Sequence, residues 1–258
     1  MIRVNGVSLD YPEMGWVLRP GSVPYSAYEA DLAKISLPGR DGNVPSPSAI
    51  RAPLWPLTVN TTPDGWEPLL ALFRSSTLLL TRDDRPGLEI IARFATSNIE
   101  KVYPGNKFVE VTFILELTGA YWRSQAVSTF STVGGRVVCW PIGGDHGGLS
   151  APVQDAVIRA KAPASPIQVT DSSGAWLTLP AASGGQWVRF EADSGRAYRT
   201  TTDTWVGGTD ISGQVDFGGP RGVFEITPTI VAGPDDRAGI LTVTGGGVEV
   251  RGRSAHAI

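Results

Sequence analysis

Short apolar runs separated by turn residues recur along most of the chain, and they predict a protein built mainly of β-strands. The clearest alternation covers residues 109–117, where apolar side chains occupy every second position and polar ones lie between. A period of two is typical of a strand with one buried face. Residues 88–103 and 107–117 flank Pro104-Gly105-Asn106, so these two segments predict a β-hairpin.

One segment has helical spacing instead. Trp66, Leu69, Leu70 and Phe73 recur at intervals of three and four residues after Thr62-Pro63-Asp64, which is a typical helix start. We expect this to be the one real helix of the chain.

Beyond residue 152 the pattern becomes a series of short apolar segments with glycine- and serine-rich turns between them. The predicted strands are 157–161, 167–171, 176–179, 187–192, 196–200, 223–228, 239–244 and 248–253. Seven or eight strands without a helical period indicate an antiparallel β-sandwich.

This change of pattern divides the chain into three parts. We expect residues 1–124 to form a β-rich first domain with the one short helix, and residues 149–258 to form the sandwich. Residues 125–148 are predicted to connect them, because Gly134-Gly135 and the glycine-rich run 143–148 leave few side chains to build a core.

Composition narrows the classes of protein to consider. The 258 residues are 41% hydrophobic and 18% charged, which suits a folded chain rather than a disordered one. The 31 glycines and 20 prolines are dispersed rather than periodic, so collagen is excluded. The net charge of −3 gives no basic footprint for specific binding to nucleic acid.

Three further features bear on the compartment. Cys139 is the only cysteine, so no intrachain disulfide is expected and synthesis in a cytoplasm fits. The first residues lack the apolar core of a signal peptide. The most apolar stretch, 69–80, is interrupted by Arg74-Ser75-Ser76 and is too short to span a bilayer, so we expect no membrane segment.

The residues that catalysis would need are scarce. A hydrolase requires a nucleophile, a base and a group that orients the base, but the only histidines are His146 in the glycine-rich connection and His256 near the end. Cys139 with His146 offers two possible ligands where a zinc site uses three or four. We therefore expect no catalytic residue, no metal and no cofactor.

Three tryptophans of the second half raise the question of sugar binding, because sugars stack on exposed aromatic faces. Trp176 and Trp187 lie inside predicted strands, where aromatic side chains are more often part of the core. Trp205 lies in a polar segment and is the candidate for an exposed aromatic contact.

The most informative local sequence is Leu37-Pro38-Gly39-Arg40-Asp41-Gly42-Asn43, a turn-forming core with Ile35 before it. Pro38 fixes φ, and Gly39 and Gly42 tolerate positive φ, so a sharp reversal is predicted here. On its own the segment could be an ordinary surface hairpin. Its order after a short strand at residues 2–7, and before a proline-rich run, resembles the distal tail proteins of long, non-contractile-tailed bacteriophages.

The second half extends this resemblance. Gly185-Gln186-Trp187-Val188-Arg189-Phe190-Glu191, followed by a hairpin and Arg196-Ala197-Tyr198, looks like the central strands of the galectin-like C-terminal domain of that family. Family members with an inserted sugar-binding module are longer, and 258 residues leave no room for one.

The resemblance implies a structural virion protein at the distal end of the tail, made in the cytoplasm of the host bacterium. A homo-hexameric ring would join the tail tube to the tail tip or baseplate, with the tail-tube, tip or baseplate and tape-measure proteins as partners. The hairpin Leu37–Asn43 would latch onto the next subunit, and DNA would pass through the ring without specific binding. Carbohydrate is not an expected ligand. The alternatives are a carbohydrate-binding adhesin and a tail-tube protein.

Overall fold

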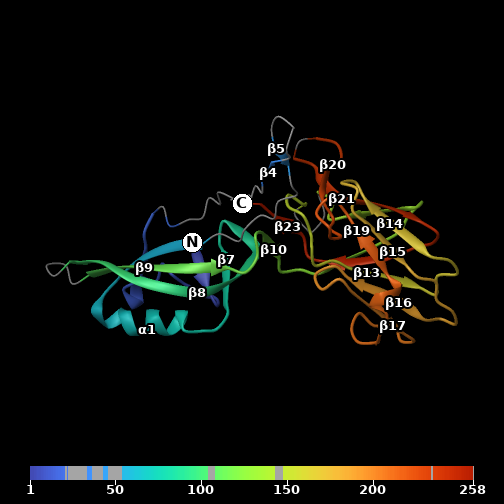
Figure 1. Cartoon of the computed structure of the whole chain (residues 1–258). Helices are drawn as coiled ribbons and strands as arrows, with labels where there is room; N and C mark the ends of the chain where they lie inside the picture. The colour runs from blue at the N-terminus through green and yellow to red at the C-terminus, as the bar shows by residue number, and fades with distance from the viewer. Residues whose placement is uncertain are drawn as a thin grey trace. The chain divides into compact units, whose positions relative to one another are not determined.

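The computed structural model describes residues 1–20, 22, 34–36, 43–45, 54–103, 108–142, 148–233 and 235–257 (Figure 1). The chain divides into two compact units, Met1–Gln125 with Ala257–Ile258 and Ala126–His256. Strands dominate both units, and α1 (Pro63–Phe73) is the one α-helix among the described residues. The predicted mainly-β fold with a single short helix is confirmed.

The first unit is built on one antiparallel sheet. Its strands are β1 (Ile2–Val4), β2 (Val7–Ser8), β3 (Val17–Leu18), β6 (Leu54–Thr61), β7 (Leu78–Arg82), β8 (Arg85–Tyr103), β9 (Phe108–Leu117) and β10 (Trp122–Ser124). The order across the sheet is β2-β1-β7-β8-β9-β6-β3, and β10 also pairs with β8. The predicted hairpin is present as β8 and β9, and its turn at 104–107 lies outside the described residues.

Helix α1 begins and packs as its sequence indicates. The Thr62 side chain accepts a hydrogen bond from the Gly65 amide at 3.2 Å, and Pro63 occupies the first turn, where its missing N–H leaves no bond unmade. The helix buries Leu69 and Phe73, and the Phe73 ring stacks on Phe113 of β9 with ring centroids 4.0 Å apart. The apolar stripe of the helix therefore covers the alternating apolar face of the sheet.

The second unit is a sandwich of two antiparallel sheets. Its strands are β11 (Ser128–Ser131), β12 (Arg136–Cys139), β13 (Val157–Lys161), β14 (Ile167–Asp171), β15 (Trp176–Leu179), β16 (Trp187–Glu191), β17 (Arg196–Thr200), β18 (Thr209–Asp210), β19 (Asp216–Gly218), β20 (Pro228–Ile230), β21 (Arg237–Thr244) and β22 (Glu249–Gly252). The short strand β23 (Ala255–His256) follows in the chain and belongs to neither sheet of the sandwich. One sheet has the order β11-β22-β13-β16-β17-β18, and the other β12-β21-β14-β15-β19, with β20 beside β21. Phe190 of the first sheet meets Phe217 of the second, with ring centroids 5.0 Å apart. The predicted sandwich is present, and its galectin-like character stays a prediction.

The glycine-rich connection predicted over 125–148 is wrong for most of its length. Residues 128–139 supply one strand to each sheet of the sandwich. Cys139 and Trp140 are fully buried, and the Trp140 ring meets Phe130 edge-on at 5.3 Å. The segment carries few apolar residues, but it adds them to a core that other strands have already built. Only 143–147 stay untested, because they lie outside the described residues.

Two smaller differences concern the end of the sandwich. The strand predicted over 223–228 is present only from Pro228 onward, although Phe224 and Ile226 are buried as core side chains. Strands β18 and β19 have two and three residues and were not predicted, because such short segments show no alternation.

Candidate functional site

The hairpin expected at Leu37–Asn43 is framed by two described strands. β4 (Lys34–Ser36) and β5 (Asn43–Pro45) pair antiparallel, with Ser36 opposite Asn43. The residues between them, Leu37 to Gly42 and so Pro38, Gly39, Arg40 and Asp41, lie outside the described residues. Within the described part of the chain, β4 and β5 pair only with each other. A two-stranded hairpin is at best marginally stable in water, so this one gains stability from any surface that it packs against.

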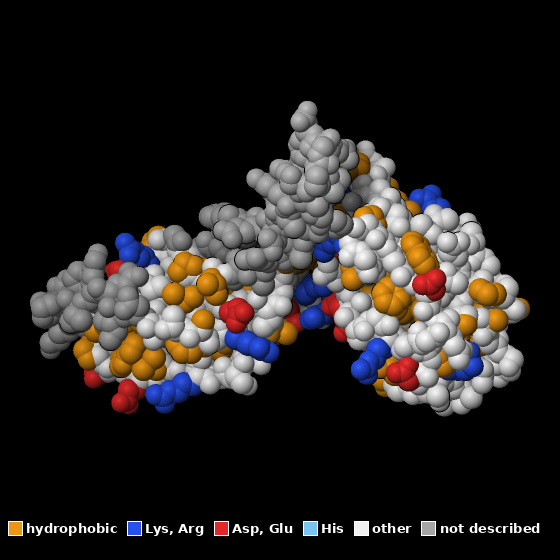
Figure 2. Space-filling model, viewed as in Figure 1, with side chains coloured by type: hydrophobic (Ala, Val, Ile, Leu, Met, Phe, Trp, Pro, Cys, Tyr) orange, Lys and Arg blue, Asp and Glu red, His pale blue; other side chains and the backbone are white. Residues whose placement is uncertain are grey.

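The first unit also has exposed apolar side chains on two of its strands. Ile91 and Phe94 of β8 and Phe108 of β9 are each about 40% exposed, and apolar patches are visible on the surface in Figure 2. These side chains do not form one patch, because Phe94 packs against Phe73 on the helix-covered face, whereas Phe108 pairs with Tyr103 at the far end of the hairpin from Ile91. Single exposed apolar residues are normal on any protein, so they mark no interaction surface here.

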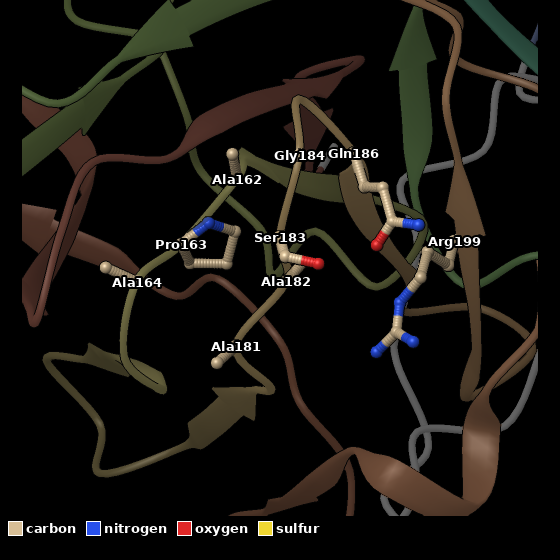
Figure 3. Close-up of a pocket in the computed structure, with 9 residues that line it drawn as sticks. All are labelled: Ala162, Pro163, Ala164, Ala181, Ala182, Ser183, Gly184, Gln186 and Arg199. Atoms are coloured by element: carbon tan, nitrogen blue, oxygen red, sulfur yellow. The ribbon is translucent and has the colours of Figure 1, made fainter.

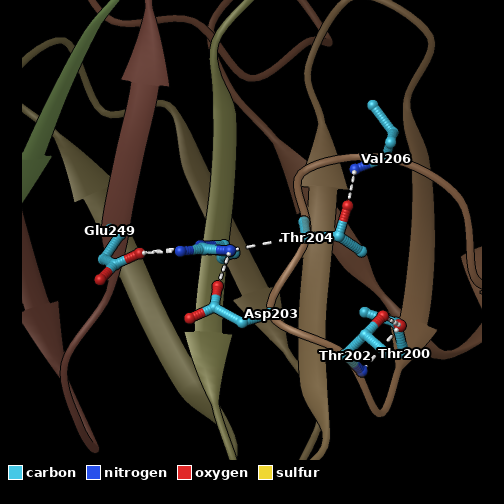
Figure 4. Close-up of polar contacts among 7 residues, drawn as sticks. Thr200, Thr202, Asp203, Thr204, Val206 and Glu249 are labelled. Atoms are coloured by element: carbon cyan, nitrogen blue, oxygen red, sulfur yellow. Dashed lines mark hydrogen bonds and ion pairs between the residues drawn. The ribbon is translucent and has the colours of Figure 1, made fainter.

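In the second unit, the best-connected polar residue is Arg159 on β13. Its guanidinium donates to Glu249 of β22 and to Asp203, each at 2.7 Å, and more weakly to the Thr204 carbonyl oxygen at 3.4 Å (Figure 4). Asp203 and Thr204 belong to the segment that joins β17 to β18. Arg159 therefore holds this segment from a strand that lies two positions away in the sheet.

Two indole rings complete the surroundings of Arg159. Its guanidinium carbon lies 4.1 Å from the ring centroid of Trp187 and 3.9 Å from that of Trp205. Arg251 approaches the Trp205 ring as well, at 5.4 Å. Cation–π contacts of this kind strengthen as water is removed, and only 6% of the Arg159 surface is exposed.

The expected aromatic contact at Trp205 stays a prediction, but the residue is less exposed than its polar sequence indicates. The side chain is half-buried, and Arg159 occupies one face of its ring. The polar sequence around Trp205 suggested exposure, but the tryptophan folds back onto the sheet because an arginine is available there. Trp187 is 7% exposed, as predicted for a strand aromatic, and Trp176 is half-buried.

Of the residues considered for catalysis, the structure describes Cys139 and His256. The Cys139 thiol is buried, and burial raises its pKa far above the ordinary value, so it is held as a neutral thiol. His256 contacts the Ser254 hydroxyl through Nε2 at 2.9 Å, and Asp145 and His146 lie outside the described residues. No group of three or more metal-ligating side chains occurs among the described residues. None of the described helices has the length and apolar character that a membrane crossing requires.

Comparison with solved structures connects these elements to a known fold. The crystal structure of SPP1 Dit (gp 19.1), described as a paradigm of the hub adsorption apparatus in phages that infect Gram-positive bacteria, aligns with a TM-score of 0.60 and 15% identity. The alignment covers 99% of this chain and 98% of that one. The chain has the fold of SPP1 Dit. The resemblance to distal tail proteins is therefore confirmed at the level of the fold, over both units.

The other structural comparisons are too weak to support a conclusion about the fold. Chains of the phage p2 baseplate in its activated conformation, with Ca or with Sr, align with TM-scores of 0.39 and 0.38 and 10% identity. These alignments cover 95% of this chain and 92% of those chains, but such scores are too low to support an argument about the fold. No protein-family model and no curated protein sequence matches the chain.

Proposed function

We propose that this chain is a structural protein at the distal end of a phage tail, and that six copies close into a ring. The ring joins the tail tube to the tail tip or baseplate, and the tape-measure protein is a further partner. The chain is made in the cytoplasm of the host bacterium and functions in the virion. It performs no chemical reaction, and DNA passes through the ring without specific recognition.

The observation that carries this proposal is the full-length match to SPP1 Dit. Alignment of 99% of one chain with 98% of the other means that both units correspond and that neither chain has a large extra module. Proteins that share a fold at 15% identity can have different functions. The support for the hub role therefore comes from the shared arrangement of both units and not from a single motif.

The hairpin supplies a mechanism for ring closure. In the proposal, Leu37–Asn43 reaches the neighbouring subunit and packs at its sheet edge, where backbone groups are otherwise free to pair. A head-to-tail contact of this kind closes into a ring only when the rotation between subunits is fixed. Arg40 is the side chain assigned to the contact, because its planar guanidinium pairs with a carboxylate through two hydrogen bonds.

The net charge of −3 suits a passage for DNA. Phosphate groups are attracted by lysine and arginine clusters and not by a mildly acidic protein, so DNA would move through without being retained.

The test is the oligomeric state of four purified proteins measured by native mass spectrometry. The unaltered chain should form hexamers, whereas replacing Leu37–Asn43 with a short Gly-Ser link should leave folded monomers. Arg40→Ala should weaken assembly more than Arg51→Ala, since removing one partner of a partly buried charge pair costs about 2–5 kcal/mol. Hexamers of undiminished stability in the hairpin replacement would contradict the latch.

A further inference from the structure

The second unit contains a hollow of about 500 Å³ that is open to solvent (Figure 3). It is lined by residues 162–164, which follow β13, by residues 181–184 and Gln186, which precede β16, and by Arg199 of β17. The lining combines a floor of alanine and proline with three polar side chains, and none of the lining residues is acidic.

The polar groups are Ser183, Gln186 and Arg199. In Figure 3 the Gln186 amide lies near the Arg199 side chain, and the Ser183 hydroxyl faces the same space. The described part of the chain offers no hydrogen-bond partner to the Ser183 and Gln186 side chains. They are therefore free to bind a ligand in place of water.

Most hydrogen-bond donors of the Arg199 side chain are unused among the described residues. A guanidinium carries five N–H groups, and the described residues engage it through one bond, from Nη2 to Gln214 Oε1 at 3.0 Å. Its Nε atom is buried and has no hydrogen-bond partner, and no carboxylate of the described residues forms an ion pair with Arg199. The Nη1 group also has no hydrogen-bond partner among the described residues, and unlike Nε it is not buried, so it can donate to an acceptor that comes from outside the chain.

The backbone that frames the hollow is fixed in an uncommon conformation. Ala162 has a φ of +41°, in the left-handed region that residues with a side chain rarely adopt. Its amide donates to the Gln186 carbonyl at 2.6 Å, and the Ala182 amide donates to the Pro163 carbonyl at 2.8 Å. Strain of this kind persists only where surrounding bonds impose it, and it often accompanies a functional site. The two loops are thus held together in the shape that makes the hollow.

We propose that the hollow binds the carboxylate of an acidic side chain carried by a second protein. A planar carboxylate matches the guanidinium of Arg199, Gln186 offers an amide donor beside it, and the short aliphatic stem of a glutamate or aspartate rests on the alanine floor. Sites for free small molecules bury most of the ligand surface, and this open hollow does not. When the acidic side chain belongs to a docked protein, the residues around it on that protein cover the rim of the hollow and exclude water. The inference does not depend on ring formation.

The experiment uses side-chain NMR signals of the full-length protein. N-acetyl-glutamate amide is added, and N-acetyl-glutamine amide, which has the same shape without the charge, is the matched probe. The Arg199 Nε–H and Gln186 amide signals should shift and saturate with the glutamate probe in the millimolar range. Binding of the glutamine probe should be at least about tenfold weaker, because it lacks the ion pair.

Variants separate recognition from folding. Arg199→Gln should reduce binding of the glutamate probe about tenfold or more, and Arg199→Lys should restore part of it as a point charge. Arg196→Gln, on the same strand but outside the hollow, is the control and should bind normally. If Arg199→Gln alters the circular dichroism, Gln186→Ala provides the second test and should also weaken binding.

Three outcomes would overturn the proposal. The first is the absence of a saturable shift with the glutamate probe, and the second is equal binding of both probes. The third is saturable binding of sodium glucuronate without binding of the glutamate probe, which would assign the hollow to an acidic sugar instead of a protein side chain.

Discussion

Replacing Arg159 with alanine should destabilise the second unit much more than any exposed charge does. The side chain is 7% exposed, donates to Glu249 and Asp203, and lies over two indole rings. Asp203 is 67% exposed, so its ion pair is largely screened and contributes at most about 1 kcal/mol. The Glu249 contact is more sheltered, and each desolvated cation–π contact contributes about 1–2 kcal/mol. The expected loss is therefore about 3 kcal/mol.

Two further variants divide this loss into its parts. Arg159→Met keeps most of the apolar stem between the rings and should lose about half as much. Asp203→Asn removes only the exposed ion pair and should lose less than about 1 kcal/mol. Arg196→Ala is the control, because Arg196 is exposed on β17, and its effect should stay within about 0.5 kcal/mol.

Amide hydrogen exchange read by mass spectrometry is the suitable assay, since it reports on each unit separately. A loss of about 3 kcal/mol should make amides of β13 and β16 exchange about a hundredfold faster, while amides of β8 and β9 stay unchanged. In Asp203→Asn only the segment 201–208 should exchange faster. An Arg159→Ala variant that loses less than about 1 kcal/mol, or no more than Asp203→Asn, would refute the assignment of Arg159 as the residue that holds this face together.

Three more predictions concern packing and boundaries. Gly65→Ala should cost about 1–3 kcal/mol in urea unfolding, because a Cβ there would lie 2.3 Å from a backbone oxygen, whereas Gly119→Ala, with nothing closer than 4.0 Å, should be nearly neutral. A fragment of residues 126–256 should unfold cooperatively. A fragment of residues 149–256 should not, because it lacks two strands and a buried tryptophan. Equal cooperativity of the two fragments would show that β11 and β12 are not part of the folding unit. Cys139 should resist a thiol reagent in the native protein and react only after unfolding, since burial raises its pKa and holds it neutral; rapid native labelling would contradict this.

The parts of the fold that sequence predicted are those with a long, regular pattern. The alternation over 109–117 gave β9, and the helical spacing of Trp66 to Phe73 gave α1, because each pattern is repeated often enough to exclude other periods. The prediction for residues 128–139 was wrong because their pattern is short and irregular. Strand β12 has four residues with two buried, and glycines next to it suggested a connection.

The surroundings of Trp205 could not be predicted from local sequence. Its polar neighbours Thr204 and Asp203 indicate a surface segment, and that is correct for the backbone. The Trp205 ring is covered by Arg159, which lies more than forty residues earlier in the sequence. The pairing of β13 with β16 brings Arg159 close to Trp187 as well. The hollow at Arg199 is equally non-local, because two loops and a strand contribute to it and only the fold brings them together.

The central claim, a ring-forming hub of a phage tail, is tested most directly by negative-stain electron microscopy of the purified full-length protein. The proposed function predicts class averages with a six-fold ring and a central opening. Averages that show only monomers at high concentration, or a ring with another number of subunits, would contradict it.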